Sequence, residues 1–279
     1  MELIKKQIHM NQWKGNVTTQ ITLDDDFIVP DTLDDMEQVM LDTGEIQIET
    51  VKNQGDKVAV KGKLEFQVLY RKESGGLQTL GGNIPFEEVV NVQGLEEKDY
   101  VGLNWMLEDL NTDMINSRKL GVQAIITLQV RVETLRDVEA AVDVDMENNS
   151  RPAGAGMSDT DGAGQVQVET LKRTANAAAI AVRRKDTYRI KEELSLTGGK
   201  PNIGQLLWRE MKLRDVTAKP LDGKLHLDGE LSVFVIYGAE DENMPVQWLE
   251  ETIPFSGDME MGDVKEDQIP MVTVRLAHK

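Results

Sequence analysis

Three histidines are the side chains of this 279-residue sequence best suited to acid–base or metal chemistry near neutral pH. His9, His226 and His278 lie far apart, and none has a metal-ligand neighbour at the spacing of a helical turn or a hairpin. His226 falls on the polar phase of an expected strand, where its counterpart in an internal repeat is Ala59. Because alanine cannot do the same chemistry, His226 is predicted to be a surface residue of a strand.

Two acidic clusters offer carboxylates for acid–base work or for a hard cation: Asp24-Asp25-Asp26 and Asp34-Asp35. A solvated loop and the first turn of a helix explain them more simply. The run Asp159-Thr160-Asp161-Gly162 resembles part of a calcium loop but lacks the third acidic ligand and the distal glutamate. No nucleophile elbow, P-loop or dinucleotide fingerprint is present. The sequence therefore predicts no catalytic, cofactor-binding or metal-binding residue, and hence no enzyme and no cofactor.

Four tryptophans are scattered along the chain: Trp13, Trp105, Trp208 and Trp248. Core packing is the favoured prediction for Trp208 and Trp248. Exposure of either for a partner is the alternative. No row of aromatic residues alternates with basic ones, as a platform for single-stranded nucleic acid would require.

Charge and composition limit the classes of molecule that the chain is expected to bind. The chain has 31 basic and 49 acidic side chains, a net charge of -18. Such a surface repels phosphate backbones and anionic lipid, and complements a basic protein, although plain solubility explains it as well. The absence of cysteine excludes disulfides and thiolate chemistry and fits a reducing cytoplasm. The first residues do not read as a signal peptide, and no apolar run approaches the ~20 residues of a membrane span.

Alternating apolar residues predict β-strands over 57–70 and 120–134, with a shorter strand at Ile46 and Ile48. Gly62 in the first of these strands suggests a bulge or a bend. Leu33, Met36, Val39 and Met40 share one face at helical spacing, which predicts a short α-helix between an Asp31 cap and a terminal Gly44. Residues 147–164 are almost all small or polar and are predicted to be a flexible linker.

The same pattern returns after the linker. Without a gap, residues 34–70 lie over residues 201–237, so that Gly62 meets Gly229 and Tyr70 meets Tyr237. A second helix is expected at Ile203, Leu206 and Leu207. Further on, Ile84-Pro85-Phe86 meets Ile253-Pro254-Phe255. These matches predict a duplication. The strand at 120–134 has no downstream counterpart, so the second copy is expected to be truncated, although Val166–Leu171 nearly repeats Val130–Leu135 and could substitute.

These motifs resemble the SPOCS domain, long listed as a domain of unknown function. The resemblance rests on residues 56–64, 68–70, 84–88 and 115–120 of the first copy, and on residues 200–203, 221–225, 229–231 and 253–256 of the second. SPOCS domains occur in endospore-forming Firmicutes, often in tandem and followed by a LysM domain, which is not found here. The resemblance implies a cytosolic protein of the mother cell that assembles or anchors the spore coat, and it carries no catalytic residues.

The fold expected is all-β, with two related sandwich or partly closed barrel domains that each contain one short α-helix. Their expected bounds are 1–146 and 165–279. The leading functional hypothesis is a non-catalytic adaptor that contacts protein partners, with an interface the sequence does not identify. A module that binds cell-wall glycan through exposed tryptophans is the first alternative. A hydrolase that uses the acidic clusters is the second.

Overall fold

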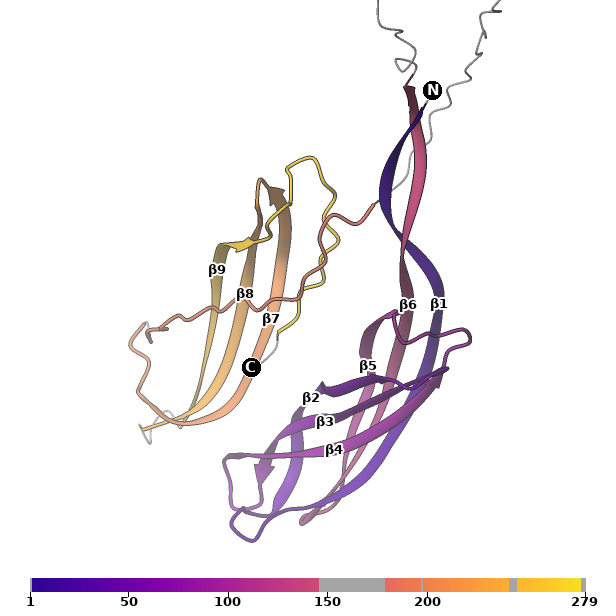
Figure 1. Ribbon diagram of the computed structural model, residues 1–279. Helices are drawn as coiled ribbons and strands as arrows, with labels where there is room; N and C mark the ends of the chain where they lie inside the picture. Colours follow the sequence, from indigo (N-terminus) through magenta and orange to yellow (C-terminus); the bar gives the residue numbers. More distant parts are fainter. Residues whose placement is uncertain (1, 146–178, 197, 241–244, 277–279) are drawn as a thin grey trace, which may run out of the picture.

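The computed structural model describes residues 2–145, 179–196, 198–240 and 245–276, and every regular element in these ranges is a β-strand (Figure 1). The prediction of an all-β fold is confirmed. The expected linker 147–164, the Asp159–Gly162 run, Val166–Leu171 and His278 lie outside the described residues, so the linker and the domain bounds stay predictions. No helix that could cross a membrane is found in the described part of the chain.

Within these ranges nine strands form three antiparallel sheets, none of which closes into a barrel. The sheets have the strand orders β1-β6-β5, β2-β3-β4 and β7-β8-β9. The strands are β1 (Glu2–Ile28), β2 (Met36–Asn53), β3 (Lys57–Lys72), β4 (Leu77–Asn91), β5 (Tyr100–Asn116), β6 (Lys119–Asp145), β7 (Ile203–Leu221), β8 (Lys224–Ala239) and β9 (Val246–Glu260). We call β1–β6 the first unit. The second unit is β7–β9 together with two flanking segments, residues 179–196 and 261–276.

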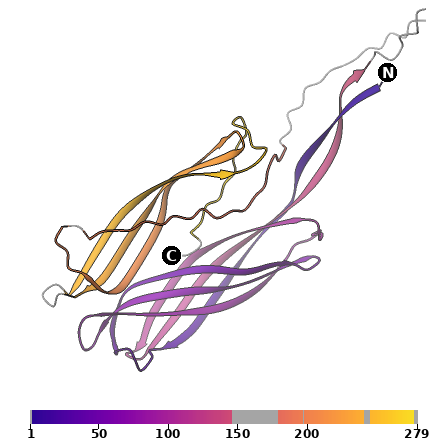
Figure 2. The same ribbon diagram turned by 60° about the vertical axis from the view of Figure 1, so that its left-hand side comes forward.

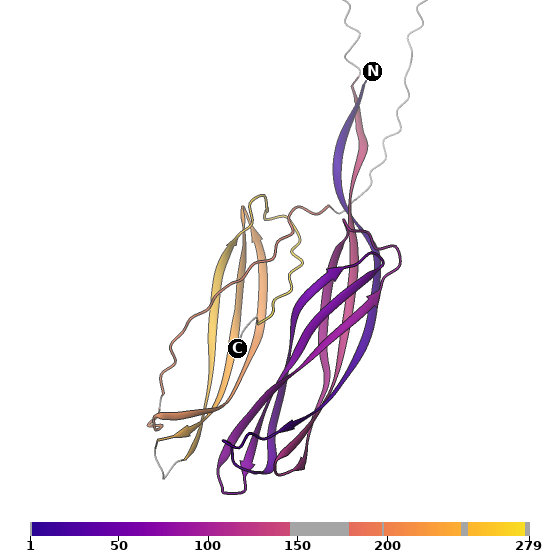
Figure 3. The same ribbon diagram turned by 60° about the horizontal axis from the view of Figure 1, so that its bottom comes forward.

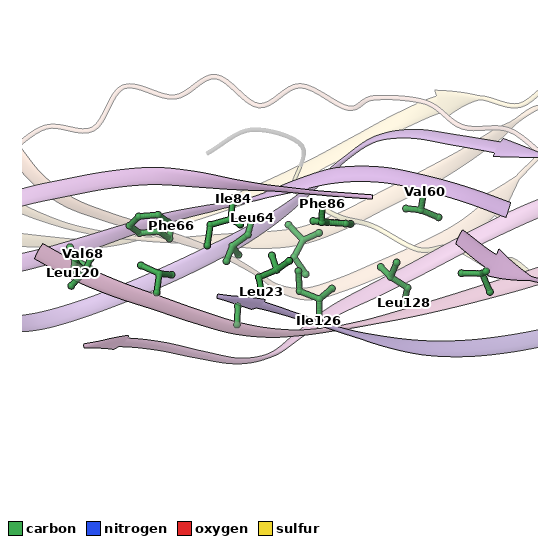
Figure 4. Packing of buried hydrophobic residues seen from close by; sticks show 14 of the residues in the cluster. Leu23, Val60, Leu64, Phe66, Val68, Ile84, Phe86, Leu120, Ile126 and Leu128 are labelled. Atoms are coloured by element: carbon green, nitrogen blue, oxygen red, sulfur yellow. The ribbon is translucent and has the colours of Figure 1, made fainter. Parts of the chain in front are cut away.

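The core of the first unit lies between its two sheets (Figure 4). Val60, Leu64 and Val68 of β3 face Ile126 and Leu128 of β6, and all five are fully buried. Both strands are central in their sheets, so their alternating apolar side chains meet in the middle of the layer. β2 lies beside β5, and β1 lies beside β4, where the edges of the two sheets approach one another.

The predicted helix over 31–44 is wrong: residues 31–35 form a turn, and β2 begins at Met36. The physical reason is a pair of irregularities in the pairing of β2 with β3, one between Met36 and Gln38 and one between Val39 and Leu41. Each bulge adds a residue and shifts the inward phase, so that Met36 and Val39 both contact the core although they are three positions apart. The bulged strand therefore imitates the spacing of a helix.

The second predicted helix is wrong for the same reason. β7 pairs with β8 through register shifts between Ile203 and Gln205 and between Leu206 and Trp208, at the positions that the repeat assigns to the two bulges of β2. The last shift in β2, between Ile48 and Thr50, also returns in β7, where it ends at Thr217. The sheet β7-β8-β9 thus repeats β2-β3-β4 strand by strand, bulges included.

Two matched positions of the repeat lie together in each unit. Gly62 pairs with Phe86 across β3 and β4, and Gly229 pairs with Phe255 across β8 and β9. A Cβ atom at Gly62 would lie 2.8 Å from Phe86 Cζ, and one at Gly229 would lie 2.6 Å from Phe255 Cζ. The glycine and the Ile-Pro-Phe sequence are therefore two halves of one contact, in which the phenylalanine ring covers the glycine.

The matched tyrosines share a contact as well. The fully buried Tyr70 donates its hydroxyl to the carbonyl of Asp34 at 3.0 Å, and the equally buried Tyr237 donates to the carbonyl of Pro201 at 3.2 Å. Asp34 and Pro201 are themselves counterparts in the repeat. Tyr70 thus connects the segment before β2 to β3, and Tyr237 connects the segment before β7 to β8.

The ends of β1 and β6 continue past the sandwich as a two-stranded ribbon (Figures 1 and 2). In it Leu3 pairs with Val144, and Trp13 pairs with Glu133. We call residues 2–13 and 133–145 the ribbon. The pairing of β5 with β6 ends at Glu133, so among the described strands none pairs with the ribbon beyond that point.

Candidate functional site

The acidic clusters lie on the surface as parts of ion pairs. Asp24, Asp25 and Asp26 are exposed on β1, a strand rather than the loop that was expected. Asp26 accepts a hydrogen bond from Lys119 Nζ at 2.6 Å. Asp34 lies in the turn before β2 and pairs with Lys72 at 3.1 Å. Contacts of this kind contribute little to stability and do not assemble a pair of reacting carboxylates.

Arg118 gathers the remaining acidic residues of that turn. Its guanidinium donates to the carbonyls of Val29 at 2.8 Å and Leu33 at 2.9 Å. It also donates to the carboxylates of Asp35 at 3.0 Å and Asp31 at 3.1 Å. One side chain from the β5–β6 turn therefore fixes residues 29–35. The sequence placed Arg118 in a family motif, but only the structure reveals this contact, because the partners lie over eighty residues away.

His226 is the centre of a cross-strand polar cluster on β8 and β9. Its Nδ1 lies 2.5 Å from Asp258 Oδ1, and its Nε2 lies 3.1 Å from Asp228 Oδ2. Lys224 Nζ donates to the other oxygen of Asp258. Ser256 Oγ is 3.4 Å from the Nε2 atom, beyond the usual reach of an activated nucleophile, and Asp228 takes the same nitrogen. The distances are those of a surface polar cluster in which the imidazole lies between two carboxylates.

We expect His226 to titrate above its usual value of about 6.5. The hydrogen bond to Asp258 raises the pKa of the imidazole and the charge of Asp228 adds to this effect, while partial burial opposes it. A raised pKa in the folded state stabilises the fold below the unfolded pKa, and this contribution is lost as the pH rises through the folded pKa. The measurement is an NMR titration of the His226 ring. Asp258→Asn should lower the pKa, and a wild-type pKa at or below 6.5 would contradict the assignment.

The other histidine among the described residues, His9, lies on the ribbon. His9 Nδ1 lies 2.6 Å from Asp137 Oδ1 across β1 and β6, and both side chains are exposed. Within the described ranges, no group of three or more histidine, aspartate or glutamate side chains is arranged to hold a metal ion.

The tryptophans divide between core and surface. Trp208 is buried, as predicted, but the core prediction for Trp248 is wrong, because 55% of its surface is exposed. Trp248 lies on β9, an edge strand, so its face of the sheet has no neighbour on one side. Lys200 Nζ covers its ring at 4.6 Å, and Arg131 covers the exposed Trp13 at 4.5 Å.

The two units contact each other through the outer faces of equivalent sheets. Leu69 of β3 packs with Leu207 and Trp208 of β7 and with Phe234 and Ile236 of β8. Arg275 adds a contact near the end of the described chain, where its guanidinium stacks over Trp105 at 3.9 Å. This stacking could not be predicted from the sequence, because Trp105 and Arg275 lie far apart in the chain.

A hollow of about 490 Å³ lies between the units, and equivalent residues line its two sides. Four pairs related by the repeat contribute to this lining: Gly44 and Met211, Ile46 and Leu213, Trp105 and Val274, and Leu107 and Leu276. Each of these four residues of β2 and β5 thus lines the hollow together with its own counterpart. This arrangement has the character of a contact between two copies of one domain.

Exposed apolar side chains mark the surfaces best suited to bind protein. On the ribbon they are Leu3, Ile4, Leu135, Val138 and Val142. In the second unit they include Ile203, Leu206, Ile269, Met271 and Val272. Larger exposed apolar surfaces commonly mark sites of protein interaction. The sequence did not reveal these surfaces; among their residues, Ile203 and Leu206 were expected on the face of a helix.

Comparison with known proteins gives one match. The family model described as SipL, SPOCS domain, matches residues 35–115 and again residues 202–279, together more than half of the chain. The two matches cover the β2-β3-β4 region and its repeat β7-β8-β9. No curated protein and no solved structure matches the chain.

Proposed function

Because the chain belongs to the SPOCS-domain family, we propose that it is a non-catalytic adaptor that contacts other proteins during assembly of the spore coat, in the mother-cell cytoplasm. The family connects the chain with sporulation. The adaptor role and the participation in spore-coat assembly are our proposals. They are supported by the apolar side chains that the chain exposes on its β-strands.

The ribbon is the observation that carries the proposal. It is a two-stranded projection with Leu135 59% exposed and Leu3 53% exposed. An isolated pair of strands is at best marginally stable in water, and a third strand or a covering surface stabilises it. Ion pairs such as Lys5 with Glu139 on the ribbon are themselves exposed and contribute little. A protein partner that covered these side chains would stabilise the ribbon and gain affinity from their burial.

A glycan-binding module is less well supported. It would need an exposed aromatic platform, and the two most exposed tryptophans, Trp13 and Trp248, lie on different units. Each ring already has a cation over it. Arg131 and Lys200 therefore occupy one face of each ring that could otherwise stack on a sugar.

The test is affinity capture from a lysate of sporulating cells at low and at moderate salt, with mass spectrometry of the captured proteins. We expect coat-assembly proteins to be enriched, and capture to weaken with salt because the chain has a net charge of -18. The double variant Leu135→Glu, Val138→Glu should no longer capture these proteins, because it places charges on the apolar surface of the ribbon.

The matched control is Ile115→Glu, which adds charge at an equally exposed apolar residue near the β5–β6 turn, away from the ribbon. It should capture the same proteins as the wild type. Capture of coat proteins by the ribbon variant at wild-type level would contradict the role of the ribbon. Enrichment of no coat protein by the wild-type chain would contradict the proposed function.

A further inference from the structure

The core face of the sheet β1-β6-β5 continues into the ribbon. Every second residue of β6 as far as Val132 points into the sandwich, where the sheet β2-β3-β4 packs against it. The ribbon lies past the end of that opposing sheet (Figure 3). β6 keeps its regular alternation up to residue 141, so Thr134, Arg136, Val138 and Ala140 continue the core face. Of these four, only Thr134 is buried.

A bulge brings apolar residues of β1 to the same face. β1 pairs with β6 through a register shift between Trp13 and Gly15, so its residues on the core face change there from odd to even numbers. The three cross-strand pairs on the ribbon's continuation of the core face are Lys6 with Ala140, Ile8 with Val138, and Met10 with Arg136. We call these six residues the ribbon patch.

The two faces of the ribbon differ in charge. On the opposite face, acidic and basic side chains pair across the strands, as Lys5 and Glu139 do at 3.1 Å. On the ribbon patch the charged residues are Lys6 and Arg136, which are both cationic and both exposed. Neither has a hydrogen bond or an ion pair with any described residue. An apolar surface with two unpaired cations therefore lies on a chain whose net charge is -18.

The geometry of the ribbon patch defines the chemistry of its complement. Ile8 and Val138 form the middle row, and Lys6 and Arg136 lie at opposite corners, four residues apart along the ribbon. Four residues of a strand span about 14 Å. An extended segment with acidic side chains at positions i and i+4 spans the same distance and presents residue i+2 on the same face. With an apolar residue at i+2, such a segment matches both the charges and the apolar middle row.

We propose that the ribbon patch binds an extended segment of another protein in which an apolar side chain lies between two carboxylates on one face. The apolar side chain packs on Ile8 and Val138, and the carboxylates pair with Lys6 and Arg136. This proposal rests on the adaptor function and names the face of the ribbon and the chemistry of the partner. The acidic segment is a local feature, because elsewhere the net charge of the chain favours a basic surface.

A second copy of the chain fits the ribbon patch less well. Two copies stacked through this face would bring Lys6 and Arg136 of both molecules into one apolar contact, where like charges repel.

A membrane is also a poorer partner. Apolar and cationic side chains together suit anionic lipid. The ribbon is only one layer thick, however, so Asp137 and Glu139 of its other face would be held close to the same lipid surface.

The probe is a cyclic β-hairpin peptide labelled with fluorescein, in which one strand presents Glu, Val and Glu at alternate positions of one face. The full chain is titrated into it and binding is followed by fluorescence polarisation. We expect saturable binding in the micromolar range. A control hairpin with Lys in place of each Glu should not bind. In an NMR titration of the chain, the amide shifts should change at Ile8 and Val138 and stay constant in the second unit.

Charge variants of the chain test the two cations. Lys6→Gln, Arg136→Gln should weaken hairpin binding by about tenfold, because two exposed ion pairs are lost. The matched control is Lys5→Gln, Lys57→Gln, which removes the same charge from the opposite face of the ribbon and from the start of β3. It should bind the hairpin as the wild type does. Circular dichroism of both double variants checks the fold.

Single variants of β6 separate the two faces of the ribbon. Val138→Glu places a charge in the middle of the ribbon patch and should abolish hairpin binding. Leu135→Glu lies three residues earlier, on the opposite face, and should leave hairpin binding unchanged. In the lysate experiment, Val138→Glu alone should account for the loss of coat proteins.

Several results would overturn the proposal. They are no hairpin binding by the wild-type chain, equal binding by the patch variants and their controls, and a loss of binding with Leu135→Glu but not with Val138→Glu. Binding of phosphatidylglycerol vesicles without binding of the hairpin would assign the ribbon patch to a membrane. A dimer in sedimentation that Val138→Glu dissociates would assign it to a second copy.

The failure of this proposal differs from that of the proposed function. Hairpin binding without capture of coat proteins would refute the proposed function alone. Capture of coat proteins that survives Val138→Glu would refute the ribbon patch alone.

Discussion

Gly62→Val should lower the free energy of unfolding of the first unit by about 3 kcal/mol. A Cβ atom at this position would lie 2.6 Å from the backbone carbonyl oxygen of Gln47 and 2.8 Å from Phe86 Cζ. The ring is able to turn aside, but the carbonyl belongs to the adjacent strand and cannot move without breaking the pairing of β2 with β3. Urea unfolding with hydrogen exchange resolved by peptide measures the loss and places it in β2–β4.

The chain contains two comparisons for this substitution. Gly15→Val is the control, because no heavy atom lies within 4 Å of a Cβ built at Gly15 in β1. Gly229→Val should destabilise the second unit by a smaller amount, because only side chains, Phe255 and Val216, crowd that position. Unfolding of Gly62→Val at the wild-type urea concentration would show that the contact between glycine and phenylalanine does not constrain the sheet.

Leu128→Ala should also cost about 3 kcal/mol of unfolding free energy, because it removes a fully buried side chain from the layer between the two sheets. Leu128 lies on β6, whose neighbours Ile126 and Val130 share the same face, so no flexible surface residue can fill the space. The loss should appear as a lower midpoint in urea at an unchanged slope.

The matched control uses the same residue type on the same strand. Leu135 lies seven positions further along β6, in the ribbon, and is 59% exposed. Leu135→Ala should therefore change the free energy of unfolding by less than about 0.5 kcal/mol. Equal losses for the two variants would mean that the ribbon and the sandwich unfold as one unit with a shared core, contrary to the burial of the two leucines.

The core substitutions and the binding experiments address different surfaces of β6. Its first half, to Val132, supplies the core of the first unit. Its second half pairs with β1 as the exposed ribbon. The same strand thus stabilises the first unit with one half and offers apolar side chains to a partner with the other.

Features that depend on the local order of residues could be predicted from the sequence. Alternation over 57–70 and 120–134 predicted β3 and the core half of β6, since a strand presents every second residue to one face. Register within the repeat predicted the likeness of β7–β9 to β2–β4, and identified Gly62, Gly229 and the two Ile-Pro-Phe sequences as special positions.

Features that depend on the pairing of distant strands became visible only in the folded chain. The bulges of β2 and β7 exist only in the pairing of these strands with β3 and β8. They place the inward apolar residues of a strand at the sequence spacing of a helix. The edge position of β9 exposed Trp248, which the usual burial of tryptophan had assigned to the core. The pairing of β8 with β9 set Asp258 against His226. A period of two fixes which residues share a face, but a face becomes core or surface only when another sheet covers it.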